Sequence, residues 1–317
     1  MLRIPITLAA AVFAAGTLFA AGPARRVAVT IDDLPVVSPT LTDNAAWRRI
    51  TTDLLAALDE HEVPAVGFVN EKKLHAGDEV DPERVALLVA WLDAGFELGN
   101  HTFSHPDLHR VELETFLDDV VRGERVTRPL LAGRERRLVW FRHPYLHTGR
   151  DRETREAVHA LLDRHGYRVA PVTIDNSEWI FARAYDLAQS RDDETSMKRI
   201  ADGYVGYMDR KFAYFERQTD ELFGRAIPHV LLIHANQLNA DHFGRLAVAI
   251  RARGYVFVGL DEVLEDEAYR SPDDYFGAGG ISWLHRWALT RGKSGEFFRG
   301  EPLTPEFVKQ AAGVDSE

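Results

Sequence analysis

The stretch RVAVTID, residues 26–32, is short, apolar and rich in β-branched residues, and it ends in an aspartate. Runs of this kind are typical of strands buried on both faces of a parallel sheet. The chain has further runs of the same character: PAVGFVN (64–70), FELGN (96–100), LVWFRHP (138–144), YRVAPVTID (167–175), HVLLIHA (229–235) and YVFVGL (255–260). We therefore expect seven parallel strands.

The segments between these runs show helical spacing of their apolar residues. In residues 45–61, Ile50, Leu54 and Leu58 fall on one helical face. Residues 81–95 begin with aspartate and proline and end at glycine, which are start and stop signals of a helix. Strands that alternate with helices predict an α/β protein, and seven units favour a closed or nearly closed barrel over an open doubly wound sheet. No G-x-G-x-x-G motif follows the first strand, so nothing supports a dinucleotide-binding role.

Two segments depart from this alternation. Residues 181–228 are mostly polar and helical, with a stripe of apolar residues at helical spacing: Tyr204, Met208, Phe212 and Phe215. The stripe predicts either packing against the core or a helical lid beside a site. The expected organisation is a signal peptide at 1–22, a barrel at 26–270 that includes the helical insert at 181–228, and a C-terminal extension packed on the barrel at 271–317.

The N-terminus has the layout of a secretory signal peptide, with Arg3 followed by an apolar run and then by small residues. We expect cleavage, export to the periplasm or the cell exterior, and no stable membrane insertion afterwards. A retained N-terminal anchor is the alternative, because the apolar run is about long enough to cross a bilayer.

Composition restricts the classes of site. A formal net charge of -11 argues against nucleic-acid binding, which needs a basic face. The chain has no cysteine, which excludes disulfides, thiolate metal sites and cysteine nucleophiles. Any metal must therefore be held by His, Asp and Glu, which suits zinc or a similar divalent ion. Nothing in the sequence indicates an oligomeric state.

Polar side chains gather at the carboxyl ends of the expected strands, where the active sites of parallel barrels lie. They are Asp32, Asp33, His101, His105, Arg142, Tyr145, Asp175, Glu178, Trp179 and His234. Two histidines and one carboxylate make a zinc site with a free position for water. A second carboxylate can accept a proton, a further histidine can donate one, and a nearby arginine keeps the base ionised. The set suits metal-assisted hydrolysis of an amide or an ester.

Five segments resemble, in order, the motifs of the polysaccharide deacetylase family, also called the NodB-homology group or carbohydrate esterase family 4. They are TIDD (30–33) for T-F-D-D, HTFSH (101–105) for H-[ST]-x-x-H, RHPY (142–145) for R-x-P-Y, DNSEW (175–179) for D-x-x-D-W, and LIH (232–234) for L-x-H. The resemblance spans residues 26 to about 260 and implies the distorted (β/α)7 barrel of that family.

The resemblance also implies a metal centre and a base. Asp33, His101 and His105 would hold a divalent metal, expected to be Zn²⁺, with Co²⁺ or Ni²⁺ as alternatives. Asp32 would be the general base, positioned by Arg142.

The remaining matches imply the acid and the substrate contacts. His234 would be the general acid, and the backbone N–H of Tyr145 would bind the oxyanion. Two residues would line the acetyl pocket: Trp179 and Leu232. Glu178 stands where the family usually has aspartate, so either Glu178 or Asp175 would partner His234.

The expected activity is removal of N-acetyl groups from peptidoglycan- or chitin-like polysaccharides or oligosaccharides by a water molecule that the metal activates. An O-acetyl xylan esterase with the same machinery is one alternative. A catalytically silent glycan-binding relative is the other. The expected metal ligands and the expected base are all present, which argues against a silent relative.

Overall fold

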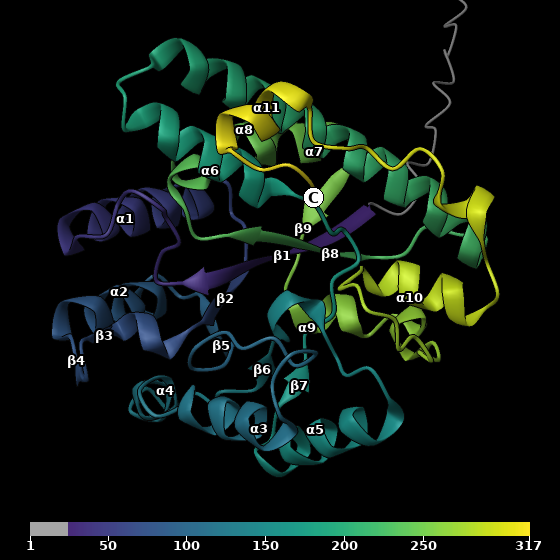
Figure 1. The fold of residues 1–317 in the computed structure, drawn as a ribbon, viewed down its shortest axis with the longest axis horizontal. Coiled ribbons are helices and arrows are strands. Elements are labelled where there is room, and N and C mark those ends of the chain that lie inside the picture. Colours follow the sequence, from purple (N-terminus) through teal and green to yellow (C-terminus); the bar gives the residue numbers. More distant parts are fainter. Residues whose placement is uncertain (1–24) are drawn as a thin grey trace, which may run out of the picture.

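The computed structural model describes residues 25–317, so the predicted signal peptide at 1–22 lies outside the described residues. Seven parallel strands form a curled sheet in the order β7-β6-β5-β2-β1-β8, with β9 beside the start of β1 (Figure 1). The strands are β1 Arg25–Leu34, β2 Ala65–Val69, β5 Glu97–Asn100, β6 Trp140–Phe141, β7 Arg168–Val169, β8 His229–His234 and β9 Tyr255–Phe257. Each strand falls within or overlaps one predicted run, and the predicted α/β fold class is confirmed.

One short segment joins the two edges of the sheet. β7 pairs with β6 at one edge. A few residues later, the backbone N–H groups of Thr173 and Ile174 each donate to the carbonyl of Val230 on β8, at the other edge. Ile174 also forms an isolated parallel bridge with Leu231. The predicted run 167–175 therefore serves both edges, although regular strand covers only two of its residues, and the barrel is distorted at this seam.

Helices surround the sheet. They are α1 Asn44–Glu60, α2 Pro82–Asp93, α3 Leu113–Arg122, α4 Thr127–Ala132, α5 Arg152–Arg164, α6 Glu178–Gln189, α7 Glu194–Phe223, α8 Gln237–Ala252, α9 Leu260–Leu264, α10 Trp283–Thr290 and α11 Glu306–Ala312. Shorter elements are the hairpin β3 His75–Ala76 with β4 Glu79–Val80, and the 3-10 turns Glu71–Leu74, Pro144–Leu146, Glu267–Arg270 and Gly295–Phe298. Between residues 25 and 317, no helix combines the length and the apolar character needed to cross a membrane.

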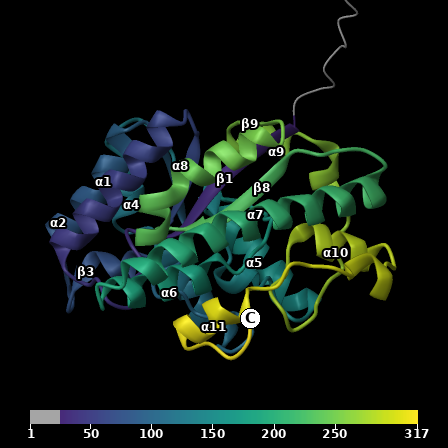
Figure 2. The ribbon, with the colours of Figure 1, turned by 90° about the horizontal axis from the view of Figure 1, so that it is seen from above.

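The region predicted as an insert folds into α6 and α7, which we call the helical lobe (residues 178–223). α6 begins at Glu178, inside the DNSEW motif and three residues earlier than the predicted insert. The side chain of Asn176, just before the helix, accepts the backbone N–H of Glu178. The predicted apolar stripe on α7 is fully buried in the main core. In the C-terminal segment, α11 packs on α6 and α10 on α7 (Figure 2).

Candidate active site

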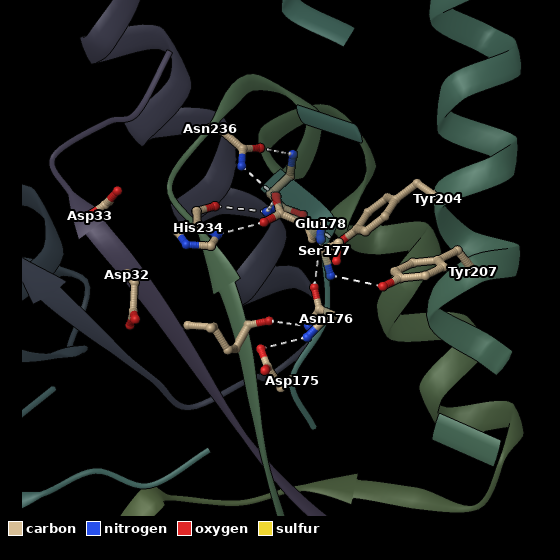
Figure 3. A network of polar contacts seen from close by, with 12 residues as sticks. Asp32, Asp33, Asp175, Asn176, Ser177, Glu178, Tyr204, Tyr207, His234 and Asn236 are labelled. Carbon is tan, nitrogen blue, oxygen red and sulfur yellow. Dashed lines mark hydrogen bonds and ion pairs between the residues drawn. The ribbon is translucent and has the colours of Figure 1, made fainter. Parts of the chain in front are cut away.

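β1 ends in a bulge that brings two adjacent aspartates to one place. The register of β1 against β2 shifts between Ile31 and Leu34, and Asp33 has a left-handed backbone with φ 70°. A bulge re-aims side chains that would otherwise alternate across a sheet. Oxygens of Asp32 and Asp33 consequently lie 3.7 and 3.8 Å from Nε2 of His101. Figure 3 shows the two carboxylates at the end of β1, pointing in different directions.

Asp33, His101 and His105 form a group that could hold a divalent cation. Oδ1 of Asp33 lies 3.8 Å from Nε2 of each histidine, and this buried oxygen has no hydrogen-bond partner within residues 25–317. Nδ1 of His101 donates to the carbonyl of Arg142 at 2.8 Å, so its Nε2 lone pair faces the group. Ligand atoms of a tetrahedral zinc ion, each about 2.1 Å from the metal, lie about 3.4 Å apart. The three side chains therefore fit such an ion after small movements.

The backbone around this group is strained. In the described part of the chain, eight residues other than glycine have positive φ, and five of them lie here: Asp33, Thr102, His105, Tyr145 and Leu146. Each such conformation costs about 1–2 kcal/mol. Local hydrogen bonds maintain it: the N–H of Thr102 donates to Oδ1 of Asn100 at 2.6 Å, and that of His105 to Oγ1 of Thr102 at 3.1 Å. Strain that is concentrated in this way is typical of a functional site.

Asp32 is buried and has few hydrogen bonds. Its Oδ2 lies 3.4 Å from Nη1 of Arg142, whereas its Oδ1 has no hydrogen-bond partner in the described part of the chain. Arg142 is itself fully buried and donates from Nη2 to Oγ1 of Thr30 at 2.8 Å. Burial raises the pKa of Asp32 to about 6, although the charge of Arg142 opposes this rise. The carboxylate is thus able to accept a proton near neutral pH.

Lys73 lies beside the neighbouring aspartate, and sequence reasoning missed it. Its Nζ donates to the backbone carbonyl of Asp33 at 2.8 Å and lies 3.6 Å from Oδ2. Burial alone would raise the pKa of the Asp33 carboxyl, but Lys73, His105 and His101 hold it well below its usual range. Lys73 belongs to the 3-10 turn after β2, which matches no motif, so only the folded structure reveals this contact.

His234 ends β8 opposite Asp32 in the register of the sheet. Its Nδ1 donates to Oε2 of Glu178 at 2.8 Å. Burial would lower the pKa of His234, but the hydrogen bond and the charge of Glu178, together with Asp33 and Asp32, raise it to about 9. The histidine can therefore hold a proton at neutral pH. Of the two candidate partners for His234, the structure places Glu178 against it.

Asp175 has a different position. Its Oδ1 accepts the backbone N–H of Asn176 at 2.9 Å, and burial raises its pKa to about 6. It lines the same cleft as Asp32, and no hydrogen bond joins it to His234 among the described residues.

The predicted residues surround a cleft of about 750 Å³. Its lining includes Asp32, Asp33, His101, His105, Tyr145, Asp175, Trp179, Leu232 and His234. Arg142 and Glu178 are fully buried behind this surface. Trp179 and Tyr145 keep about half of their side chains exposed, at 43% and 55%. One face of α6 supplies part of the wall through Trp179, Ala182, Arg183 and Asp186. The cleft can therefore present apolar and aromatic surface beside the charged centre.

Residues 20–170 match the sequence model of the polysaccharide deacetylase family. This range holds the TIDD, HTFSH and RHPY motifs, whose side chains meet at the cleft. Residues 20–170 belong to the polysaccharide deacetylase family. The resemblance that the motifs indicated is thereby confirmed.

Several individual proteins are similar to parts of this chain. The chitooligosaccharide deacetylase of Bradyrhizobium sp. (strain ANU 289) is 39% identical over 80 residues, which are 25% of this chain and 32% of that protein. The chain thus aligns with about a third of that relative. A polysaccharide deacetylase from Bacillus cereus is similar in structure, with 15% identity, coverage of 74% of this chain and 91% of that chain, and a TM-score of 0.51. The peptidoglycan deacetylase PdaC of Bacillus subtilis has 20% identity, coverage of 78% and 93%, and a TM-score of 0.48.

Part of the site lies beyond the range that matches the deacetylase family. Glu178 and His234 both follow residue 170, and so do two further donors to Glu178, Asn236 and Asn239. The two asparagines follow His234 in the sequence HANQLN. A helix N-cap rule could have identified Asn236, but not its contact with Glu178.

Proposed function

We propose that this protein is a metal-dependent deacetylase that removes N-acetyl groups from peptidoglycan- or chitin-like polysaccharides or oligosaccharides. One observation carries the proposal. A single cleft holds a two-histidine, one-carboxylate group beside a buried carboxylate with a pKa of about 6 and a histidine with a pKa of about 9. Groups whose environments separate their pKa values in this way suit a base and an acid in one reaction. Membership of residues 20–170 in the deacetylase family supports the same activity.

The residues of the first half of the site would generate the nucleophile. Asp33, His101 and His105 would hold Zn²⁺, or Co²⁺ or Ni²⁺, which when bound polarises the acetyl carbonyl and makes a water molecule more acidic. Asp32 would accept a proton from a water molecule while the oxygen of that water attacks the acetyl carbon. Arg142, in contact with Asp32, keeps the carboxylate oriented.

The second half of the site would complete bond cleavage. The backbone N–H of Tyr145 donates to the carbonyl oxygen as negative charge develops there. His234, held by Glu178, protonates the sugar nitrogen as the carbon–nitrogen bond breaks, which leaves acetate and a free amine. The apolar acetyl methyl group is accommodated by two side chains of the cleft wall: Trp179 and Leu232.

The setting of the reaction is part of the proposal. The barrel at 26–270 would carry the chemistry, the helical lobe would limit which glycans reach it, and residues 271–317 would support the lobe. The N-terminal layout favours export, which would bring the protein to extracytoplasmic glycans.

Acetate release tests the proposal. Chitooligosaccharides, peptidoglycan and acetylxylan are incubated with the protein before and after chelation. We expect release from N-acetylated glycans, loss after chelation, and recovery with Zn²⁺ or Co²⁺. Full activity of a preparation shown to be metal-free by elemental analysis contradicts metal dependence. Release from acetylxylan alone identifies an O-acetyl esterase, and no release from any substrate rejects the activity.

A further inference from the structure

Glu178 accepts hydrogen bonds from other side chains in addition to His234. It is fully buried and accepts three N–H donors: Nδ1 of His234 at 2.8 Å, Nδ2 of Asn236 at 2.5 Å and Nδ2 of Asn239 at 2.7 Å. Figure 3 shows Glu178 beside His234, with Asn236 close to both. The donors divide between its two oxygens, with His234 on Oε2 and both amides on Oε1. Each added donor restricts rotation of the carboxylate and strengthens a charge-assisted network.

The orientation of both amides is determined by other groups. Oδ1 of Asn236 accepts the backbone N–H of Asn239 at 2.9 Å as the N-cap of α8, so its Nδ2 must face Glu178. Nδ2 of Asn239 also donates to the carbonyl of His234 at 2.8 Å. If the Asn239 amide were turned over, its oxygen would face a carboxylate and a carbonyl, which repel it.

Tyr204 supplies the contact that maintains this orientation. It lies on α7, is fully buried, and donates its hydroxyl hydrogen to Oδ1 of Asn239 at 2.8 Å. Figure 3 shows Tyr204 reaching from its helix toward the Glu178 group. The order of contacts is therefore Tyr204, Asn239, Glu178, His234. It begins on a helix that the sequence placed outside the strand–helix alternation.

We propose that Tyr204 and Asn239 are positioning residues that act through Glu178 to hold His234 in place for proton donation. The inference rests on the proposed deacetylase function for its kinetic consequence. It gives the helical lobe a second role: in addition to forming a wall of the cleft, the lobe fixes the acid. A lobe that only packs against the barrel would affect stability without changing the state of His234.

Tyr204→Phe tests this role, with Tyr214→Phe as the matched control. Tyr214 is a buried tyrosine on the same helix, but its hydroxyl contacts His285, Gln218 and the carbonyl of Phe298, away from the cleft. We expect Tyr204→Phe to lower kcat about tenfold with little change in KM, since a small displacement of a catalytic group is costly. Tyr214→Phe should keep the wild-type kcat. Equal kcat for Tyr204→Phe and wild type overturns the proposal.

A double-mutant cycle shows whether the effect passes through Glu178. In a Glu178→Gln background, Tyr204→Phe should cause little further loss, because the group through which it acts has already been changed. A full additional tenfold loss overturns the proposal. If Tyr204→Phe does not fold, Asn239→Asp takes its place: it keeps the side-chain volume, puts a second carboxylate against Glu178, and should lower kcat about 100-fold.

Proton NMR separates this inference from the proposed activity. A histidine N–H that donates to a buried carboxylate gives a downfield proton signal, which can be assigned to His234 by its loss in His234→Gln. Tyr204→Phe should shift this signal, and Tyr214→Phe should not. An unchanged signal in Tyr204→Phe overturns the positioning role. Absence of acetate release by the wild type, with the shift present, rejects the enzymatic activity and leaves the contacts intact.

Discussion

Asp32 and His234 lie side by side at the ends of β1 and β8, yet their surroundings are opposite. One oxygen of Asp32 lies 3.4 Å from Arg142, and the other has no hydrogen-bond partner among the residues that the structure describes. His234 is bonded to a carboxylate that two asparagine amides also hold. Burial dominates at Asp32 and raises its pKa to about 6, whereas Glu178 overcomes burial at His234 and raises its pKa to about 9.

The difference shows how one cleft can contain a group suited to be a base and a group suited to be an acid. A buried carboxylate with few hydrogen bonds is costly to keep charged, so it readily accepts a proton. A histidine beside a well-bonded carboxylate keeps its proton until another group accepts it. The proposed mechanism needs this asymmetry, and each prediction below removes or measures one part of it.

Replacing the two adjacent aspartates should have the largest effect. Asp32→Asn leaves the proposed metal ligands intact but removes the proton acceptor, and turnover should fall about 10²–10⁴-fold. Asp33→Asn replaces an anionic ligand, so metal content should fall and excess metal should restore part of the activity. Elemental analysis and acetate release are measured together on both variants. Loss of metal from Asp32→Asn would mean that the two roles are exchanged, and unchanged rate and metal content in both variants would reject the site.

Glu178→Gln should make His234 a less effective general acid. Without the glutamate charge, the pKa of His234 should fall from about 9 toward its ordinary value, and the alkaline limb of the kcat profile should move to lower pH. We expect kcat to fall about 100-fold, at the lower end for a positioned acid or base. Asp175→Asn is the control, because no hydrogen bond in the described structure joins Asp175 to His234, and this variant should leave the alkaline limb where it is. A shift caused by Asp175→Asn alone would reverse the choice of partner.

Arg142→Lys should have a smaller effect, on the pKa of Asp32. The charge of Arg142 lowers the pKa of Asp32, and a shorter cation without the fork of the guanidinium should do so less well. The acidic limb of the kcat/KM profile should therefore move above pH 6, and the rate at neutral pH should fall about tenfold. An acidic limb that does not move would show that Asp32 is not the group that this limb reports.

His229 offers the smallest test, at the other end of the strand that carries His234. It is buried and pairs with no carboxylate among residues 25–317, and burial lowers its pKa to about 3. Because the folded pKa lies below the unfolded value, the unfolded chain binds the proton more tightly, and this contribution to stability is lost as pH falls below about 6.5. We expect a loss of about 1 kcal/mol between pH 7 and pH 5.5. Urea unfolding of wild type and His229→Gln at both pH values measures it, and equal pH dependence in the two proteins would contradict it.

The sequence predicted the parts of this protein that depend on short-range pattern. Apolar runs gave the strands, and reading only their carboxyl ends found Asp32, His101 and His234, which the structure brings to one cleft. In the run predicted at 138–144, regular strand covers only two residues, Trp140 and Phe141. The contacts of Lys73 with Asp33 and of Tyr204 with Asn239 could not be predicted from the sequence. Each contact joins residues more than 30 positions apart, and neither Lys73 nor Tyr204 belongs to a motif.

The left-handed residues have a consequence for thermal stabilisation of this protein. A screen for stabilising substitutions would select glycine or asparagine wherever the backbone is left-handed, because these residues tolerate that conformation. At Thr102, His105 or Tyr145, glycine or asparagine would remove a side chain that lines the cleft or that holds the backbone beside it. Among the described residues other than glycine, three with a left-handed backbone lie elsewhere and are exposed, namely Glu62, Glu135 and Asp192. Glycine or asparagine at these three positions should therefore raise thermal stability without lowering turnover.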